Sequence, residues 1–251
     1  MSKQISKKNI ERYSRQIILK NVGPAGQKKI LNSKVLIIGL GGLGCPVADH
    51  LCRAGVGTIG IVDFDKVSLS NLHRQSFFSH KDIKKFKVDV IKKKLNLIDQ
   101  KIKVKKFKKA ITENNANSLI KNFDIIIDGS DNFKTKFLLK KISIKYNKTL
   151  IIGAISKFDG HVFAFNFNNR NEPCLKCFYQ SEPSDDLLNC EREGILGPVA
   201  GIIGSLQANE ALKRILKTKD YLNKKILILD TLKLNFRKVL FNKKKNCICK
   251  K

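Results

Sequence analysis

The chain has 251 residues, 42% of them hydrophobic, which is enough for one α/β domain with a full core. It contains 50 Lys and Arg against 21 Asp and Glu, so its formal net charge is +29. No run of about 18 apolar residues occurs, and the first residues, MSKQISKKNIERYSRQ, lack the apolar core of a signal peptide. We therefore expect a cytoplasmic protein without a membrane partner.

The positive charge by itself suggests nucleic-acid binding. The lysines, however, are scattered over every predicted helix and loop and do not alternate with aromatic residues as in single-strand binders. We interpret them as solvated surface charge and expect no nucleic-acid partner. A basic surface would still speed the capture of an anionic ligand or an acidic protein.

The predicted elements begin with an amphipathic helix at residues 9–19, with Arg15 on its polar side. Next comes a buried strand, Val35–Ile38, followed by glycines in G-x-G-x-x-G spacing. The glycines permit a tight turn, close approach of an anionic ligand, and packing of the next helix on its strand. Asp63 ends a second strand, where a carboxylate can accept hydrogen bonds from ribose hydroxyls. This unit predicts a nucleotide site.

Further along, helices and strands alternate at the spacing of a doubly wound sheet. The pattern predicts helices at 82–98, 112–121, from 133, and at 198–216, and strands at 101–107, 124–128, 150–155, 161–167, 226–230 and 234–241. The fold class is thus a Rossmann-like, mostly parallel α/β sheet with an antiparallel C-terminal extension, in one domain spanning 1–251. The ligand crevice of such a sheet lies at the carboxyl ends of its strands, which is where Asp131 and Asn132 fall.

Seven cysteines in a chain without a secretory signal do not indicate a disulfide framework. Cys45 and Cys52 lie seven residues apart on one helix face and are interpreted as small core residues. Cys174 and Cys177 form a C-x-x-C, and the tail at 242–251 adds a shorter pair. Two such pairs predict a four-thiolate Zn²⁺ site, the alternative being a metal-free tail. These four ligands are Cys174, Cys177, Cys247 and Cys249.

A crossover segment at 168–196 has little periodicity, and long irregular loops inside compact domains are usually functional. It contains Cys190, next to Arg192, which would favour a thiolate. A lone cysteine is ordinarily a small buried residue of the hydrophobic core. A reactive nucleophile is the alternative at this position.

The strings GLGGLG, VDFD, SNLHRQ and DGSDNF, in this order, resemble the E1-like ThiF/MoeB/HesA adenylyltransferase family. That family includes the enzymes that activate the sulfur carriers of thiamine and molybdopterin synthesis, and the ubiquitin-activating enzymes. The resemblance covers residues 12–249. It implies ATP and Mg²⁺ as cofactors besides Zn²⁺.

The resemblance also implies residue roles. Arg15, in RYSRQ, would enter the nucleotide site of a neighbouring subunit, which implies a homodimer. Asp131 would hold Mg²⁺, and Lys87 would contact the ATP phosphates, although the family's GKxK element is KKFK here. Cys190 would take the activated acyl group or form a persulfide-linked adduct. The full expected ATP site is Gly39, Gly41, Gly42, Gly44, Asp63, Ser70, Asn71, Leu72, His73, Arg74, Gln75, Lys87, Asp131 and Asn132, with Arg74 also catalytic.

From this resemblance we expect ATP-dependent adenylylation of the C-terminal Gly carboxylate of a ubiquitin-like sulfur carrier protein. A ThiS-type carrier of thiamine synthesis is favoured over a MoaD-type carrier of molybdopterin synthesis. A sulfurtransferase or cysteine desulfurase would then be a further partner. The opening motif is also compatible with an NAD-dependent oxidoreductase, and the charge with a nucleic-acid binding module.

Overall fold

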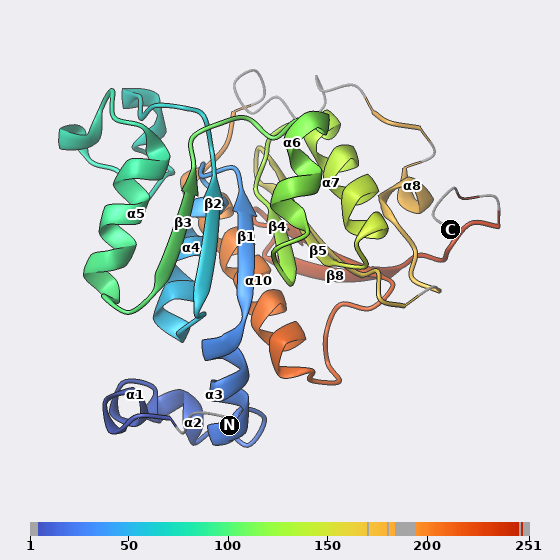
Figure 1. Ribbon diagram of the computed structural model, residues 1–251. Coiled ribbons are helices and arrows are strands. Elements are labelled where there is room, and N and C mark those ends of the chain that lie inside the picture. Colours follow the sequence, from blue (N-terminus) through green and yellow to red (C-terminus); the bar gives the residue numbers. More distant parts are fainter. Residues whose placement is uncertain (1–4, 170, 180, 184–193, 246, 248–251) are drawn as a thin grey trace.

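The computed structural model describes residues 5–169, 171–179, 181–183, 194–245 and 247. In this part of the chain one eight-stranded sheet has the strand order β3-β2-β1-β4-β5-β6-β7-β8 (Figure 1). The strands β3, β2, β1, β4 and β5 run parallel to one another, and the pairings of β5 with β6, β6 with β7 and β7 with β8 are antiparallel. The strands are β1 (Lys34–Ile38), β2 (Thr58–Val62), β3 (Lys103–Phe107), β4 (Ile125–Asp128), β5 (Thr149–Ser156), β6 (Asp159–Asn166), β7 (Lys225–Asp230) and β8 (Asn235–Leu240). The predicted fold class is confirmed.

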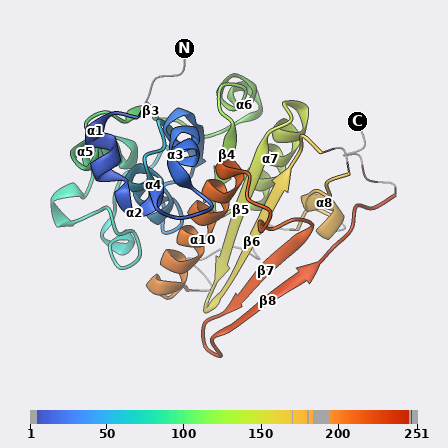
Figure 2. The ribbon, with the colours of Figure 1, turned by 90° about the horizontal axis from the view of Figure 1, so that it is seen from below.

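Strand β1 shows why the central strands are continuously apolar. Val35 and Ile37 enter the core cluster on one face of the sheet, and Leu36 and Ile38 enter the cluster on the other. Helices α3 (Gly23–Asn32), α4 (Gly44–Ala54), α5 (Lys87–Ile98) and α10 (Gly197–Leu216) supply the first cluster. Helices α6 (Glu113–Ile120), α7 (Phe133–Lys145) and α8 (Leu175–Phe178) supply the second. Figure 2 shows these two helical layers on opposite sides of the sheet. A strand covered on both faces has no polar side to display.

The N-terminal segment differs from the single helix predicted at 9–19. It forms two short helices, α1 (Lys7–Arg12) and α2 (Ser14–Ile17), with the break at Tyr13. Tyr13 is only 2% exposed, and its hydroxyl donates to Asp99 Oδ2 at 3.3 Å. A Cβ on Gly55 would lie 2.6 Å from the Tyr13 ring. The helix breaks because the ring is buried against a glycine far away in the sequence.

The helix predicted to begin at Asp82 begins instead at Lys87. The preceding residues use their backbone groups elsewhere: Lys84 N donates to Val67 O, and Val67 N donates to Lys85 O, each at 2.9 Å. Lys84 also has a φ of 68°, in the left-handed region that ends helical structure. Within 80–82 a 3₁₀ turn, η2 (His80–Asp82), replaces the expected helix start. Helices α3 and α8 were not predicted.

The antiparallel extension ends in an aromatic cluster. The Phe241 ring, directly after β8, lies 6.1 Å from Phe163, 6.2 Å from Phe165 and 5.6 Å from Phe178. Beyond this cluster Cys247 lies beside Cys174, next to α8, which is at the opposite end of the sheet from β3 (Figure 1).

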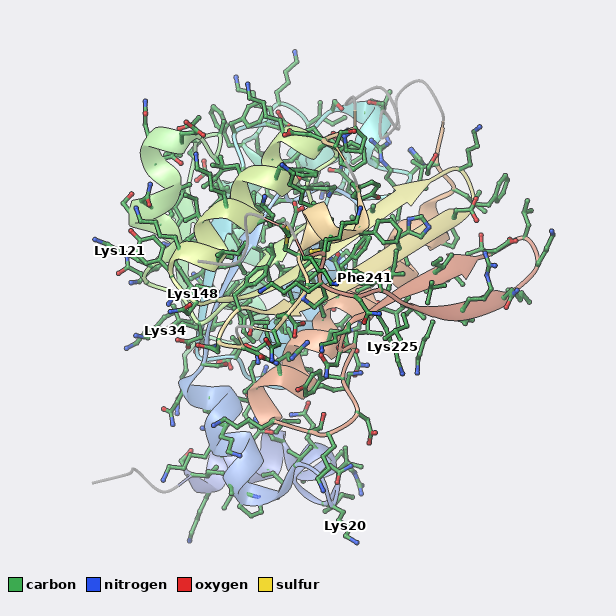
Figure 3. All side chains as sticks on the ribbon, turned by 90° about the vertical axis from the view of Figure 1, so that its right-hand side faces the viewer. Lys20, Lys34, Lys121, Lys148, Lys225 and Phe241 are labelled. Atoms are coloured by element: carbon green, nitrogen blue, oxygen red, sulfur yellow. The ribbon has the colours of Figure 1, made fainter. Side chains whose placement is uncertain are left out.

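Charged side chains cover the outside. Figure 3 shows five lysines projecting from the ribbon on one side of the molecule: Lys20, Lys34, Lys121, Lys148 and Lys225. They come from separate elements, as expected for solvated surface charge. In the described residues we find no helix with both the length and the apolar character needed to cross a bilayer.

Candidate active site

A cavity of about 270 Å³ opens at the carboxyl ends of β1, β2, β4 and β5. This is the position expected for the ligand crevice of a doubly wound sheet. Four groups of residues, from loops and from the first turns of α5 and α7, line it: Gly39, Gly41, Gly42 and Leu43; Asp63, Phe64, Asp65, Asn71, Arg74, Gln75 and Lys87; Lys109, Ala110 and Ile111; and Gly129, Ser130, Asp131, Asn132, Thr135 and Lys136.

The glycine loop has the shape that its spacing predicts. Gly39 has a φ of 83°, and a Cβ there would lie 2.8 Å from the Gly129 carbonyl. A Cβ on Gly44 would lie 2.0 Å from Gly39 O, so only glycine lets α4 start this close to β1. Gly44 thus shapes the loop and does not itself line the cavity. The N-terminus of α4 directs its backbone N–H groups toward this loop, a favourable position for an anion.

Asp63 and Lys87 stand at the end of β2. The Asp63 carboxylate is 8% exposed and accepts Leu40 N and Asp65 N, each at 2.7 Å. Burial raises the pKa of Asp63, and the nearby Lys87 cation opposes that rise. Lys87 is itself buried, and its Nζ lies 2.9 Å from Asp65 Oδ2. Asp65 was not a predicted site residue, although it is the last residue of the VDFD string.

The loop after β2 contributes half of its predicted residues. Asn71, Arg74 and Gln75 line the cavity, whereas Ser70, Leu72 and His73 do not. Arg74 Nη1 donates to Ser70 O at 2.8 Å and lies 2.8 Å from His73 Nε2, so these neighbours hold the guanidinium.

Two features seat this loop against the cavity. The start of α10 packs on it so closely that a Cβ on Gly197 would lie 2.6 Å from His73 O. Gln75 is 3% exposed, and its Oε1 has no hydrogen-bond partner among the described residues. A buried acceptor of this kind fits a ligand that donates a hydrogen bond.

The turn after β4 brings Asp131 to the cavity. Asn132 accepts Thr135 N at 2.8 Å and so caps α7, and its Nδ2 donates to Asp131 Oδ1 at 3.3 Å. Asp131 is exposed, as a carboxylate that meets a ligand would be. Beneath it, the buried Lys136 pairs with Asp128 at 3.1 Å. Sequence reasoning missed Lys136 and Lys109, because single lysines do not stand out in a lysine-rich chain.

Arg15 does not line the cavity of its own chain. Its neighbours fix the segment: Arg12 Nη2 donates to Ile98 O at 2.9 Å, and Gln16 Nε2 donates to Ala54 O at 3.2 Å. Arg15 itself is exposed on α2. This placement leaves it available to a second subunit.

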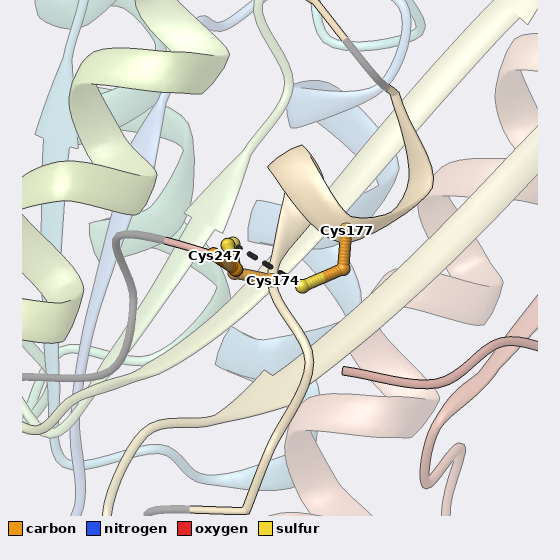
Figure 4. A group of neighbouring side chains, drawn as sticks. All are labelled: Cys174, Cys177 and Cys247. Atoms are coloured by element: carbon orange, nitrogen blue, oxygen red, sulfur yellow. Dashed lines mark hydrogen bonds between the residues drawn. The ribbon is translucent and has the colours of Figure 1, made fainter. Parts of the chain in front are cut away.

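Three of the four predicted zinc ligands lie together (Figure 4). Cys174 Sγ is 4.0 Å from Cys177 Sγ and 3.5 Å from Cys247 Sγ, and all three are buried. Thiolates about 2.3 Å from a tetrahedral zinc ion stand about 3.8 Å apart, so the group fits this metal. Cys249, like Cys190, lies outside the described residues. Cys45 and Cys52 are fully buried core residues, as predicted.

Chemically, the cavity combines four basic side chains, Arg74, Lys87, Lys109 and Lys136, with a glycine loop and an exposed carboxylate. Cations and backbone N–H groups suit a polyphosphate. A carboxylate oxygen is a ligand that Mg²⁺ prefers, and Asp131 therefore fits such an ion.

Solved structures with the same fold include Escherichia coli MccB. Its complex with MccA-N7isoASN has a TM-score of 0.85 at 23% identity and covers 98% of this chain and 76% of that one. The structure of MccB with ATP has a TM-score of 0.83 at 24% identity, covering 95% and 74%. At these identities the comparison shows the fold.

Sequence comparison goes further. The "Adenylyltransferase and sulfurtransferase MOCS3" of Dictyostelium discoideum is 41% identical over 234 residues, which are 92% of this chain and 54% of that protein. The chain therefore spans about half the length of this relative. The "Sulfur carrier protein adenylyltransferase" of Thermus thermophilus is 35% identical over 246 residues, 96% of this chain and 91% of that protein. The ThiF family profile matches residues 13–251, and the chain belongs to the ThiF family.

Proposed function

We propose that this protein is an ATP-dependent adenylyltransferase that activates the C-terminal Gly carboxylate of a ubiquitin-like sulfur carrier protein. The observation that carries the proposal is the convergence of Arg74, Lys87 and Asp131 on one cavity beside the glycine loop. The similarity to the Thermus thermophilus sulfur carrier protein adenylyltransferase extends over 91% of that protein and supports the same activity.

The chemical task is to turn a poor electrophile into a good one. A carboxylate repels nucleophiles, whereas its mixed anhydride with AMP carries a good leaving group. The carboxylate oxygen attacks the α-phosphorus, a new P–O bond forms, and the bond to pyrophosphate breaks. The enzyme contributes positioning and charge neutralisation.

Each side chain has a part in that task. Arg74 and Lys87 neutralise the phosphates, Asp63 accepts ribose hydroxyls, and the glycine loop lets its backbone approach the nucleotide. Asp131 would hold Mg²⁺, which supplies further positive charge when bound. Arg15 would reach the site of the second subunit in a homodimer, because it is exposed and its neighbours anchor it outside its own cavity.

The carrier is proposed to be ThiS-type, with the MoaD-type carrier as the alternative. This preference comes from the strings GILGPVAG and RYSRQ, which resemble the thiamine-pathway enzyme more closely. Sulfur would reach the adenylate from a sulfurtransferase or a cysteine desulfurase, and Cys190 would form the covalent adduct.

We also propose that Cys174, Cys177, Cys247 and Cys249 hold one Zn²⁺, tying the tail to the α8 region. The mutual distances of the first three sulfurs support this. A cytoplasmic location is part of the proposal, since thiolate ligands persist in a reducing compartment.

The deciding experiment is ATP–pyrophosphate exchange with Mg²⁺ and either a ThiS-type or a MoaD-type carrier ending in Gly-Gly. Exchange with one carrier only would establish the activity and name the carrier. Asp131→Ala and Arg74→Ala should each lower the rate about 100-fold or more. The matched control is Arg53→Ala, an arginine on α4 that pairs with Asp49 away from the cavity.

Two results would contradict the proposal. One is the absence of exchange with either carrier in folded protein that binds ATP. The other is saturable NADH binding without ATP binding, which would favour an oxidoreductase.

A further inference from the structure

Lys136 is a lysine in an unusual place. It lies on α7 and is 1% exposed, although lysine side chains almost never lose contact with water unless they are paired. It belongs to the floor of the cavity, behind Asp131. A buried ammonium group at this position needs a reason.

The contacts of Lys136 supply one. Its Nζ donates to Asp128 Oδ2 at 3.1 Å, to Ser130 O at 2.7 Å and to Gly153 O at 2.9 Å. An ammonium group has three N–H donors, so these bonds use all of them. Lys136 therefore has no donor left for a substrate, and its effect is exerted through the groups it holds.

Those groups form the turn that leads to Asp131. Asp128 Oδ1 accepts Ser130 N at 2.9 Å and Ser130 Oγ at 2.6 Å, so the carboxylate closes the turn on itself. Lys136 binds the other oxygen of the same carboxylate and also the Ser130 carbonyl. The residue immediately before Asp131 is thus fixed at its N–H, its hydroxyl and its carbonyl.

The end of β4 is also held from the other face of the sheet. Gln207 of α10 is fully buried, and its Nε2 donates to Asp128 O at 2.8 Å. A Cβ on Gly153 would lie 2.6 Å from the Gln207 amide, so glycine is required there for this contact. Lys136 and Gln207 therefore both bind Asp128, the last residue of β4, one from each of the two helical layers.

We propose that Lys136, assisted by Gln207, is a positioning residue that holds the Asp131 carboxylate where a metal–triphosphate complex meets it. The inference rests on the proposed function, because it assigns a metal role to Asp131. The turn is fixed on one side by Lys136 and on the other by the Asn132 cap of α7, which leaves Asp131 little freedom. The partners that orient a metal ligand typically change metal affinity by about 10- to 100-fold when removed.

The test measures nucleotide binding without a carrier, with Mn²⁺ as the metal probe. Lys136→Met keeps the side-chain length and removes the ammonium. We expect it to weaken Mn²⁺·ATP binding about tenfold or more, while ATP binding in the presence of EDTA changes less than about twofold. Metal-free ATP depends on Arg74 and Lys87, which the substitution does not touch. Lys141→Met, the same change at an exposed position of α7, should alter neither constant.

A double-mutant cycle tests whether Lys136 acts through Asp131. In the Asp131→Ala background, adding Lys136→Met should have less than about a twofold further effect on Mn²⁺·ATP binding. Equal weakening of ATP binding with and without metal would overturn the inference, since it would indicate general loosening. The inference would also be overturned if the two substitutions weakened Mn²⁺·ATP binding independently, so that the double variant showed the product of the two single effects.

Lys136→Met leaves the buried Asp128 charge unpaired and can unfold the protein. In that case the same binding measurements are made on the double variant Asp128→Asn with Lys136→Met, in which no buried charge is left unpaired. If that variant does not fold either, they are made on Gln207→Leu. Each should show the same metal-selective weakening, and wild-type Mn²⁺·ATP binding in the variant used would overturn the inference. Wild-type protein that binds Mn²⁺·ATP but catalyses no exchange would overturn the proposed function alone.

Discussion

The Lys87–Asp65 pair allows a prediction about both the stability and the activity of the protein. The two charged atoms are 2.9 Å apart, but the side chains are 7% and 47% exposed. Asp65→Asn removes one countercharge of a buried ammonium that keeps the nearby Asp63 carboxylate, whereas Lys87→Met takes the cation away from both the half-exposed Asp65 and the buried Asp63. The two substitutions break the same ion pair from its two sides.

The exposures set the magnitudes. In Asp65→Asn the lysine keeps Asp63 as a countercharge and the lost carboxylate is half exposed, so this variant should lose about 0–1 kcal/mol. Lys87→Met leaves the buried Asp63 carboxylate without its cation, which should cost about 1–3 kcal/mol. For activity, Lys87→Met should lower ATP–pyrophosphate exchange about 100-fold, because the phosphates lose a cation. Asp65→Asn retains Lys87 and should stay within about tenfold of wild type.

The assays are urea unfolding of the nucleotide-free protein and exchange at saturating carrier. Both variants and wild type are compared at one pH and one salt concentration, since salt screens the pair. An Asp65→Asn variant destabilised as much as Lys87→Met would refute the burial argument. An Asp65→Asn variant less active than Lys87→Met would refute the assignment of Lys87 to the phosphates.

Three further predictions concern the core and the cysteines. Gly60→Ala should lower the free energy of unfolding in urea by about 1–3 kcal/mol, because its Cβ would lie 2.5 Å from the Phe123 ring. The control is Gly201→Ala on α10, whose Cβ meets nothing within 4 Å, so its effect should be neutral or stabilising. Equal effects of the two substitutions would contradict the packing. Burial raises the pKa of the Cys45 thiol to about 12, so about one molecule in 10,000 carries the thiolate at pH 8, and mass spectrometry should find Cys45 alkylated only after unfolding. The purified wild-type protein should contain one zinc ion per chain, and the Cys174→Ser variant should contain less than half as much zinc and melt at a lower temperature. If removing the metal from the wild-type protein left its melting temperature unchanged, that result would argue against the site.

Much of the fold is encoded locally and could therefore be predicted. The run Val35–Ile38 is apolar at every position because both faces of β1 are covered, and the alternation of strands and helices follows from the same arrangement. The glycine spacing works at short range too, because Gly44 and Gly39 approach each other within a single turn. Asn132 acts as the cap of α7, three residues before its partner Thr135 N.

Contacts between distant segments decided the rest. No local signal breaks a helix at Tyr13, since the break depends on a glycine 42 positions later that leaves room for the ring. Lys87 and Lys136 look like any other lysine in the sequence. Their burial follows from which carboxylate and carbonyl groups the fold places beside them.

The same distinction applies to the site. The sequence alone determined the glycine loop, the acidic strand ends and the cysteine pair, because turn geometry, strand polarity and ligand spacing are properties of a few neighbouring residues. The sequence also predicted that Cys247 would join Cys174, but only the tertiary structure shows the packing that brings these residues together and that places the Arg74 loop against the start of α10. Those contacts depend on packing between elements far apart along the chain. The burial and the charge pairing of a residue there depend on all the elements around it, and not on its sequence neighbours alone.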